Sequence, residues 1–172
     1  RRAGGSSTSL YSNFLGFYSG RYVDADYSNF LGESSGMYAT SASNSNFFGR
    51  RAGYQATSAS NSNFFGQQAG EAAATASNSI FIGQNAGSGD SVDNTGDVDD
   101  FSILIGPNTL TDGNSNSIAL GGYATNTAPN QLMIGSSTRP INEVVINGVD
   151  AYLNFGATGG TLGYGFRDNA GI

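Results

Sequence analysis

Carboxylates are the groups from which acid–base chemistry could be built in this chain, because it contains no histidine, cysteine or lysine. Asp24 and Asp26 lie two residues apart, and Glu33 follows seven residues later. Paired carboxylates of this kind hydrolyse glycosidic bonds. Two acids in a short polar stretch are also typical of a solvated turn. No histidine or lysine is present to act as a further general acid or base. We therefore predict that the protein is not an enzyme, with a polysaccharide-cleaving spike as a lower alternative.

A second group of carboxylates lies in a 12-residue stretch, 89–100, which is rich in aspartate, asparagine and glycine. Calcium takes 6–8 oxygen ligands, and such a stretch could supply them. The spacing matches neither the EF-hand pattern nor the glycine-rich calcium repeats. The sequence therefore favours a solvated surface loop, and we expect no cofactor. The weak calcium candidates are Asp90, Asp93, Asp97, Asp99 and Asp100.

Composition excludes several classes of protein. Without cysteine or histidine there is no disulfide framework and no cysteine- or histidine-bound zinc. The net charge is −6, whereas a nucleic-acid-binding protein needs a basic surface, so we expect no nucleic-acid partner. The apolar runs are far shorter than the roughly 18 residues typical of a membrane span, so we expect no membrane insertion.

The elements that position these residues are set by a repeat. One five-residue segment recurs eight times, and its closing glycines are 14 to 17 residues apart except for one interval of 23. Such a unit is too short for a helix pair or a propeller blade. The repeat predicts an all-β fold, a parallel β-roll or β-solenoid of about eight coils of 14–17 residues. The segments are 12–16, 28–32, 45–49, 62–66, 79–83, 102–106, 117–121 and 131–135.

Each coil is expected to hold two short strands. The first is the repeated segment, which ends at glycine, a residue able to turn the chain at positive φ. The second is a stretch of alanine and serine, whose small side chains would form a thin wall. The repeat domain is predicted to cover 1–135, and 136–172 is predicted to be a short, non-repetitive, β-rich cap or connector.

Two positions of the repeated segment are apolar in every coil, the third and the fourth. Successive strand residues point to opposite faces, and one coil has a single interior, so one of these columns must lie outside. A large apolar stripe rarely stays exposed on a soluble monomer. We expect the third column to lie outside and to bind other copies of the chain. Its self-association residues would be Phe14, Phe30, Phe47, Phe64, Phe81, Leu104 and Met133.

The second column changes character along the chain. It holds asparagine in the first four coils and isoleucine or leucine in the last four. Stacked asparagines can form a hydrogen-bonded ladder from coil to coil. The other interpretation is simple drift between repeats, and the sequence does not separate the two.

The repeated segments and the small-residue stretches between them resemble known repeats. They are similar to the left-handed parallel β-roll heads of trimeric autotransporter (YadA-like) adhesins, and more so to the SNxFxGxxAG repeats of phage tail-fibre-like proteins. The resemblance covers roughly residues 10–135. It implies a homotrimer whose hydrophobic strands face the three-fold axis, on a fibre that is extracellular, on a cell surface or on a virion.

The leading hypothesis is therefore a non-enzymatic structural fibre segment, the shaft or head of an adhesin or tail fibre. A cell-surface receptor or glycan would bind at loops on the coil corners. Residues 1–4 match 50–53, which follow a repeated segment, so the chain opens just after a strand. A longer parent chain would explain this, and a neighbouring copy supplying that strand would give a head-to-tail filament. An ice-binding solenoid is a further, lower alternative.

Overall fold

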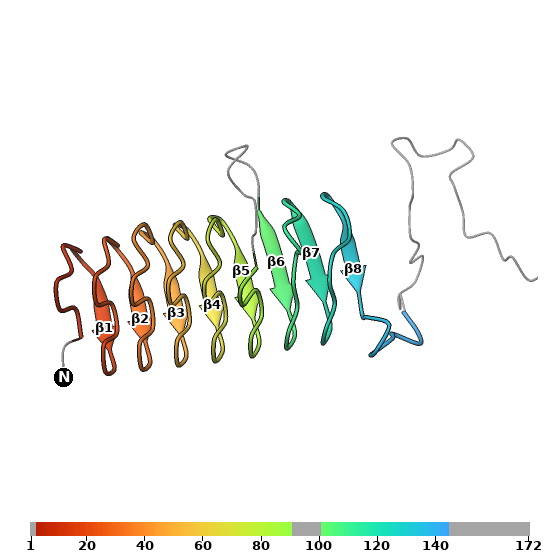
Figure 1. Cartoon of the computed structure of the whole chain (residues 1–172), viewed down its shortest axis with the longest axis horizontal. Coiled ribbons are helices and arrows are strands. Elements are labelled where there is room, and N and C mark those ends of the chain that lie inside the picture. The colour runs from red at the N-terminus through yellow and green to blue at the C-terminus, as the bar shows by residue number, and fades with distance from the viewer. Residues whose placement is uncertain (1–2, 91–100, 145–172) are drawn as a thin grey trace, which may run out of the picture. The chain divides into compact units, whose positions relative to one another are not determined.

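The repeats form one parallel β-sheet, with one strand in each coil (Figure 1). The computed structural model describes residues 3–90 and 101–144. Its strands follow one another in chain order across the sheet. They are β1 Asn13–Leu15, β2 Asn29–Leu31, β3 Asn46–Phe48, β4 Asn63–Phe65, β5 Ile80–Ile82, β6 Ser102–Ile105, β7 Ser117–Leu120 and β8 Leu132–Ile134. The predicted all-β solenoid is confirmed, with about seven turns and no helix among these residues.

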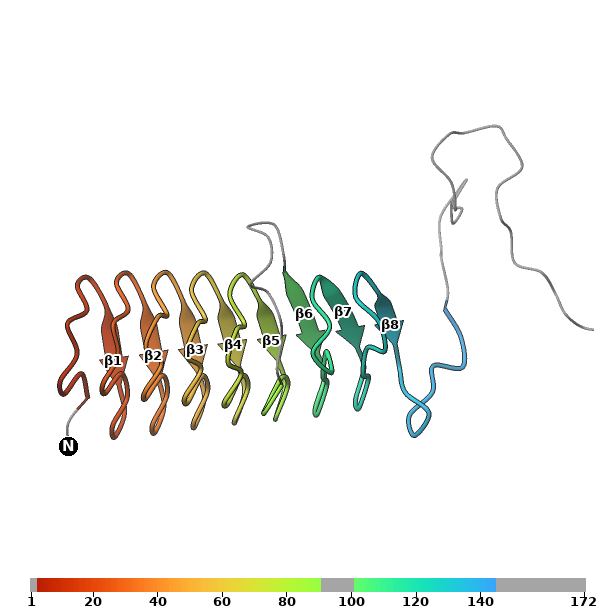
Figure 2. The same ribbon diagram turned by 45° about the horizontal axis from the view of Figure 1, so that its top comes forward.

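Neighbouring strands pair in parallel and in register, so that equivalent residues of successive coils lie side by side. Phe30, for example, pairs with Phe47, and Phe47 pairs with Phe64. The coils can be followed as a row of similar loops that run from one strand to the next in Figure 2. Because the register is exact to the residue, each column of the repeat becomes a continuous line of side chains along the sheet.

The core of the repeat is a stack of phenylalanine rings inside the coils. Ring centroids are 4.7 Å apart between Phe30 and Phe47, 4.6 Å between Phe47 and Phe64, and 4.7 Å between Phe64 and Phe81. The ring planes in these pairs are within 8° of parallel. All four side chains are fully buried. Stacking adds to the free energy that each ring already gains from leaving water.

The wall opposite the rings is built from residues with little or no side chain. Gly87 lies against the ring of Phe81, and a Cβ at Gly87 would come within 2.5 Å of the ring carbon Cε2. Alanines complete this wall and are fully buried, as the predicted thin wall requires. They are Ala39, Ala42, Ala56, Ala59, Ala73 and Ala76.

Buried serines just before β2, β3 and β4 link the coils. The hydroxyl of Ser28 donates to the carbonyl oxygen of Ala42 at 2.8 Å and accepts the backbone N–H of Ser45 at 3.1 Å. The hydroxyl of Ser45 repeats this with Ala59 at 2.7 Å and with the N–H of Ser62 at 3.0 Å. Each serine therefore satisfies its own hydroxyl within one coil and a backbone donor of the next.

The predicted second strand is not formed in the described coils. The alanine- and serine-rich segments touch the next coil through single bridges, such as Ser41 with Ser58 and Leu110 with Thr125. The chain turns too often there to stay extended, and Asn44, for example, has a φ of 57°. The repeat unit ends at Ile141, and 142–172 form a separate unit. Residues 136–144 contain no strand, and the remainder of the predicted β-rich segment lies outside the described residues.

Candidate self-association surface

The outer face of the sheet is formed by the second and fourth columns of the repeated segment. Both alternate with the buried third column, so their side chains point away from the coil. The fourth column is apolar in all eight strands, and the second is apolar in β5 to β8. Their exposed members include Leu15, Phe48, Ile80, Ile82, Ile105, Leu132 and Ile134, with exposed fractions from 36% to 69%. We call these two columns the outer face.

The predicted self-association residues must be corrected, because the structure places the third column inside the coil. Phe30, Phe47, Phe64, Phe81 and Leu104 are fully buried within one chain and offer no surface to a second one. Phe14 and Met133 are partly buried and pack against the same core. Self-association itself remains a prediction, and the surface available for it is the outer face.

A signal in the sequence could have identified the inner column. Each Phe of the third column in the first five coils is accompanied, six residues later, by a glycine that leaves room for the ring. In the sixth coil Leu104 replaces Phe, and Leu110 stands at the glycine position. In the seventh coil Ala119 replaces Phe, and Thr125 stands there. Glycine is therefore kept at this position in the coils whose third column is Phe, where the ring needs the room, and is absent where Leu104 or Ala119 replaces the ring.

Asparagines occupy the second column over β1 to β4 and form a ladder on the outer face. The Nδ2 of Asn13 donates to the Oδ1 of Asn29 at 2.7 Å. Asn29 donates in the same way to Asn46, and Asn46 to Asn63, both at 2.8 Å. The asparagine ladder expected as one of two interpretations of this column is therefore confirmed. The outer face thus has an amide half, β1 to β4, and an aliphatic half, β5 to β8.

The outer face carries no formal charge. All of its positions in β1 to β8 are Asn, Leu, Phe or Ile. The chain as a whole carries −6, so its charges lie elsewhere. Among the described residues, Arg51 and Glu71 form an ion pair, and the guanidinium of Arg51 lies 4.5 Å from the ring centre of Tyr54. Identical copies would therefore meet at this face without repulsion between like charges.

The carboxylates that could do chemistry are not gathered into a site. Asp24 and Asp26 lie in the turn before β2, whereas Glu33 lies beyond its other end. The Oδ1 of Asp26 accepts the backbone N–H of Leu10 at 2.6 Å, so this carboxylate holds a turn. Strand β2 lies between the two aspartates and Glu33.

Asp90, the first calcium candidate, is buried and serves the backbone of the next coil. Its Oδ1 accepts the hydroxyl of Thr111 at 3.0 Å and the N–H of Gly113 at 3.3 Å. Its Oδ2 accepts the N–H of Thr111. Both oxygens thus face hydrogen-bond donors. The other calcium candidates, Asp93, Asp97, Asp99 and Asp100, lie outside the described residues, and the residues that are described contain no cluster of three metal-ligating side chains.

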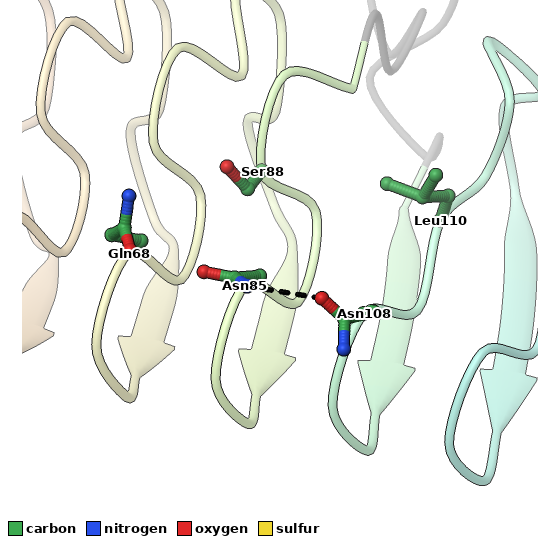
Figure 3. Close-up of a pocket in the computed structure, with 5 residues that line it drawn as sticks. All are labelled: Gln68, Asn85, Ser88, Asn108 and Leu110. Carbon is green, nitrogen blue, oxygen red and sulfur yellow. Dashed lines mark hydrogen bonds between the residues drawn. The ribbon is translucent and has the colours of Figure 1, made fainter.

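A shallow polar depression of about 320 Å³ lies at one corner of coils four to six (Figure 3). Ser88 and Gly89 lie here at the positions where the third coil carries the larger Tyr54 and Gln55. The Nδ2 of Asn85 donates to the Oδ1 of Asn108 at 3.0 Å, which leaves the Nδ2 of Asn108 available. Amide groups with unused donors suit an uncharged, hydroxyl-rich ligand. The lining residues are Gln68, Asn85, Ser88, Asn108 and Leu110.

No family model matches this chain, and no similar protein is found among the curated proteins. The described residues contain no helix that is long and apolar enough to cross a membrane.

Proposed function

We propose that this chain is a non-enzymatic structural fibre segment that associates with copies of itself through the outer face of its sheet. The observation that carries the proposal is the uncharged face of exposed Leu, Phe and Ile side chains along β1 to β8. Parallel sheets are normally covered on both faces, and here the coil covers only one. A second copy supplies a face of the same length and the same strand repeat of about 4.8 Å.

The mechanical part of this function follows from the same architecture. Neighbouring coils are joined by backbone hydrogen bonds, and the phenylalanine-bearing coils are joined in addition by buried serines and by the ring stack. Repeats of this kind act as a quasi-one-dimensional rod. The resemblance to tail-fibre and adhesin repeats supports an extracellular, cell-surface or virion location. It also supports a homotrimer, with the head-to-tail filament as the alternative assembly.

Replacing Ile82 and Ile105 by threonine together should weaken self-association roughly 100- to 1,000-fold, because each change removes apolar surface from the outer face. Threonine keeps the β-branched shape, and both side chains lie outside the coil, so the fold should be retained. Sedimentation velocity over a range of concentrations measures the effect. Negative-stain images of the unmodified chain would separate discrete oligomers from long filaments.

Ile141 provides the matched control, because it is 48% exposed and lies outside the two columns of the outer face. Ile141→Thr should leave the association constant unchanged. A wild-type chain that stays monomeric at all accessible concentrations would overturn the proposal. So would a double variant that associates as tightly as the wild type.

The polar depression favours a second role, and we propose it as a contact for an uncharged sugar. Its amides offer donors and acceptors to hydroxyl groups, and the half-buried Leu110 offers an apolar contact for a methyl group. N-acetylglucosamine combines these features and is a suitable probe. Titration should shift the side-chain NH₂ signals of Gln68, Asn85 and Asn108 and saturate in the millimolar range, as expected for a few hydrogen bonds at a shallow site.

Asn108→Asp tests this contact with little change of shape. The aspartate keeps an acceptor for Asn85 and tolerates the left-handed φ of 55° at this position, but it loses the free NH₂ donor. Affinity for N-acetylglucosamine should fall roughly 3- to 10-fold. Asn44→Asp, at an exposed corner with a φ of 57°, should have no effect. Linear, non-saturating shifts in the wild type would refute the contact.

A further inference from the structure

We propose that the asparagine ladder fixes the direction and the register in which copies of this chain associate. Copies would lie side by side with their N-terminal ends together, each coil level with the same coil of its neighbour. This inference rests on the proposed self-association. A homotrimer about an axis along the rod would already have its copies in one direction, and the inference is that the difference between the two halves of the outer face enforces that direction and register.

The ladder leaves hydrogen-bonding capacity facing outward. Within it, Asn29 and Asn46 each donate one N–H and accept one, at 2.7–2.8 Å. An amide has two N–H donors and two acceptor lone pairs, so each of these side chains keeps one donor and one acceptor site unused. Both are half-buried, so water can still reach these sites in the single chain. Any partner that covers the ladder must replace that water with hydrogen bonds.

The relative direction of two copies decides whether hydrogen bonds from the partner can replace the water on the asparagine ladder. When two copies run the same way and in register, the amide half of one meets the amide half of the other, and the free donors and acceptors can pair. When they run in opposite directions, Asn29 and Asn46 meet the aliphatic half, where the second column is Ile80, Ile103 and Ile118. The amides would then be buried without partners, which is strongly unfavourable. A polar residue in an apolar seam fixes the register of coiled coils by the same physics.

The occupant of the face that best fits this pattern is a second copy of the chain. The face has no charge for a charged partner to complement. It instead has a polar half and an apolar half that repeat at the strand spacing, and another copy in the same direction matches both halves coil by coil. The symmetry axis relating such copies runs along the rod, whereas copies in opposite directions need an axis across it.

Spin labels give a direct test, because the chain has no cysteine and a single introduced one is labelled uniquely. Glu33 in the second coil and Gln67 in the fourth are exposed, and each follows the closing glycine of its repeated segment. We would label Glu33→Cys and Gln67→Cys in separate samples of the full chain and measure distances between copies by double electron–electron resonance. Same-direction association in register predicts the same distance at both sites.

Opposite-direction association predicts different distances at the two sites. It would offset the two Glu33 labels by five coils, roughly 24 Å along the rod, and the two Gln67 labels by one coil, roughly 5 Å. A clearly longer distance at Glu33 than at Gln67 would overturn the proposal. The absence of any distance between copies would instead mean that association fails, which refutes the proposed function and not this inference alone.

The ladder is then removed by changing Asn29, Asn46 and Asn63 to isoleucine in the Glu33→Cys chain. The outer face becomes aliphatic over most of its length, so the opposite direction no longer leaves these amides unpaired. The Glu33 distance distribution should gain a second, longer component. Thr57→Ile, which adds an aliphatic side chain on the opposite wall, should keep a single component. A triple variant that keeps only the short distance would overturn the role of the ladder.

Discussion

Replacing Phe64 by alanine should lower the free energy of unfolding by roughly 3–5 kcal/mol, the cost of removing a buried phenylalanine from a packed core. The ring is fully buried and stacks on Phe47 and Phe81 at 4.6 and 4.7 Å. Its loss leaves a cavity that the opposite wall, made of glycine and alanine, has no side chains to fill. Chemical denaturation followed by circular dichroism measures the change. The Ile82→Thr, Ile105→Thr background removes any contribution from association.

The neighbouring Phe65 is the matched control, because it has the same chemistry and points to the outer face. It is only half-buried and meets Phe48 at a ring distance of 5.1 Å. Phe65→Ala should cost about 1 kcal/mol in the dissociated chain. Equal losses for the two variants would contradict the assignment of inner and outer columns.

Gly83→Ala should destabilise the stack by several kcal/mol, because a Cβ at this position would lie 2.5 Å from the carbonyl oxygen of Gly106 and 2.6 Å from its carbonyl carbon. Both contacts are with the backbone of the next coil, so no side chain can move aside. The φ of 139° adds strain for any residue with a Cβ. The coils would have to separate locally, which breaks the hydrogen bonds between β5 and β6. Thermal unfolding and amide hydrogen exchange at these strands measure the effect.

Gly89→Ala is the control that separates the effect of the backbone clash from the effect of the positive φ. Gly89 has a φ of 69°, and a Cβ there would meet nothing within 4 Å. Alanine already occupies this region at Ala72, with a φ of 57°. The expected loss is about 1 kcal/mol, from the left-handed conformation alone. If Gly89→Ala were as damaging as Gly83→Ala, the close approach of neighbouring coils would not be the cause.

The strands and their order could be predicted from the sequence because each repeated segment carries a complete local signal. Large apolar residues followed by glycine mark the strand and its end, and the constant spacing makes every strand parallel to the last. The structure places β1 to β8 inside the eight predicted segments. The second strand of each coil could not be predicted correctly. Alanine and serine carry no strong preference for a strand, and asparagine readily takes the left-handed turns found at Asn44 and Asn61.

Which face of the strand points inward was harder to predict, because the third and fourth positions of the repeated segment are both apolar and lie on opposite faces. Hydrophobicity alone therefore does not choose between Phe64 and Phe65. The choice depends on shape across the coil, where glycine makes room for a ring, and on the serine at the start of the strand. That serine lies on the same face as the third column and finds its hydrogen-bond partners only inside, as Ser45 does with Ala59.

The pairing of phenylalanine with glycine makes the second, third and fourth coils interchangeable. Each presents a buried ring to a ring in the coil before it and in the coil after it, so an additional coil of the same kind could be inserted there without disturbing either neighbour. The length of the rod would then increase by about 4.8 Å for each coil that is added. The sixth and seventh coils, with Leu104 and Ala119 in place of the ring, are not interchangeable in this sense. An additional coil of this kind is therefore expected to fit only among the phenylalanine-bearing coils.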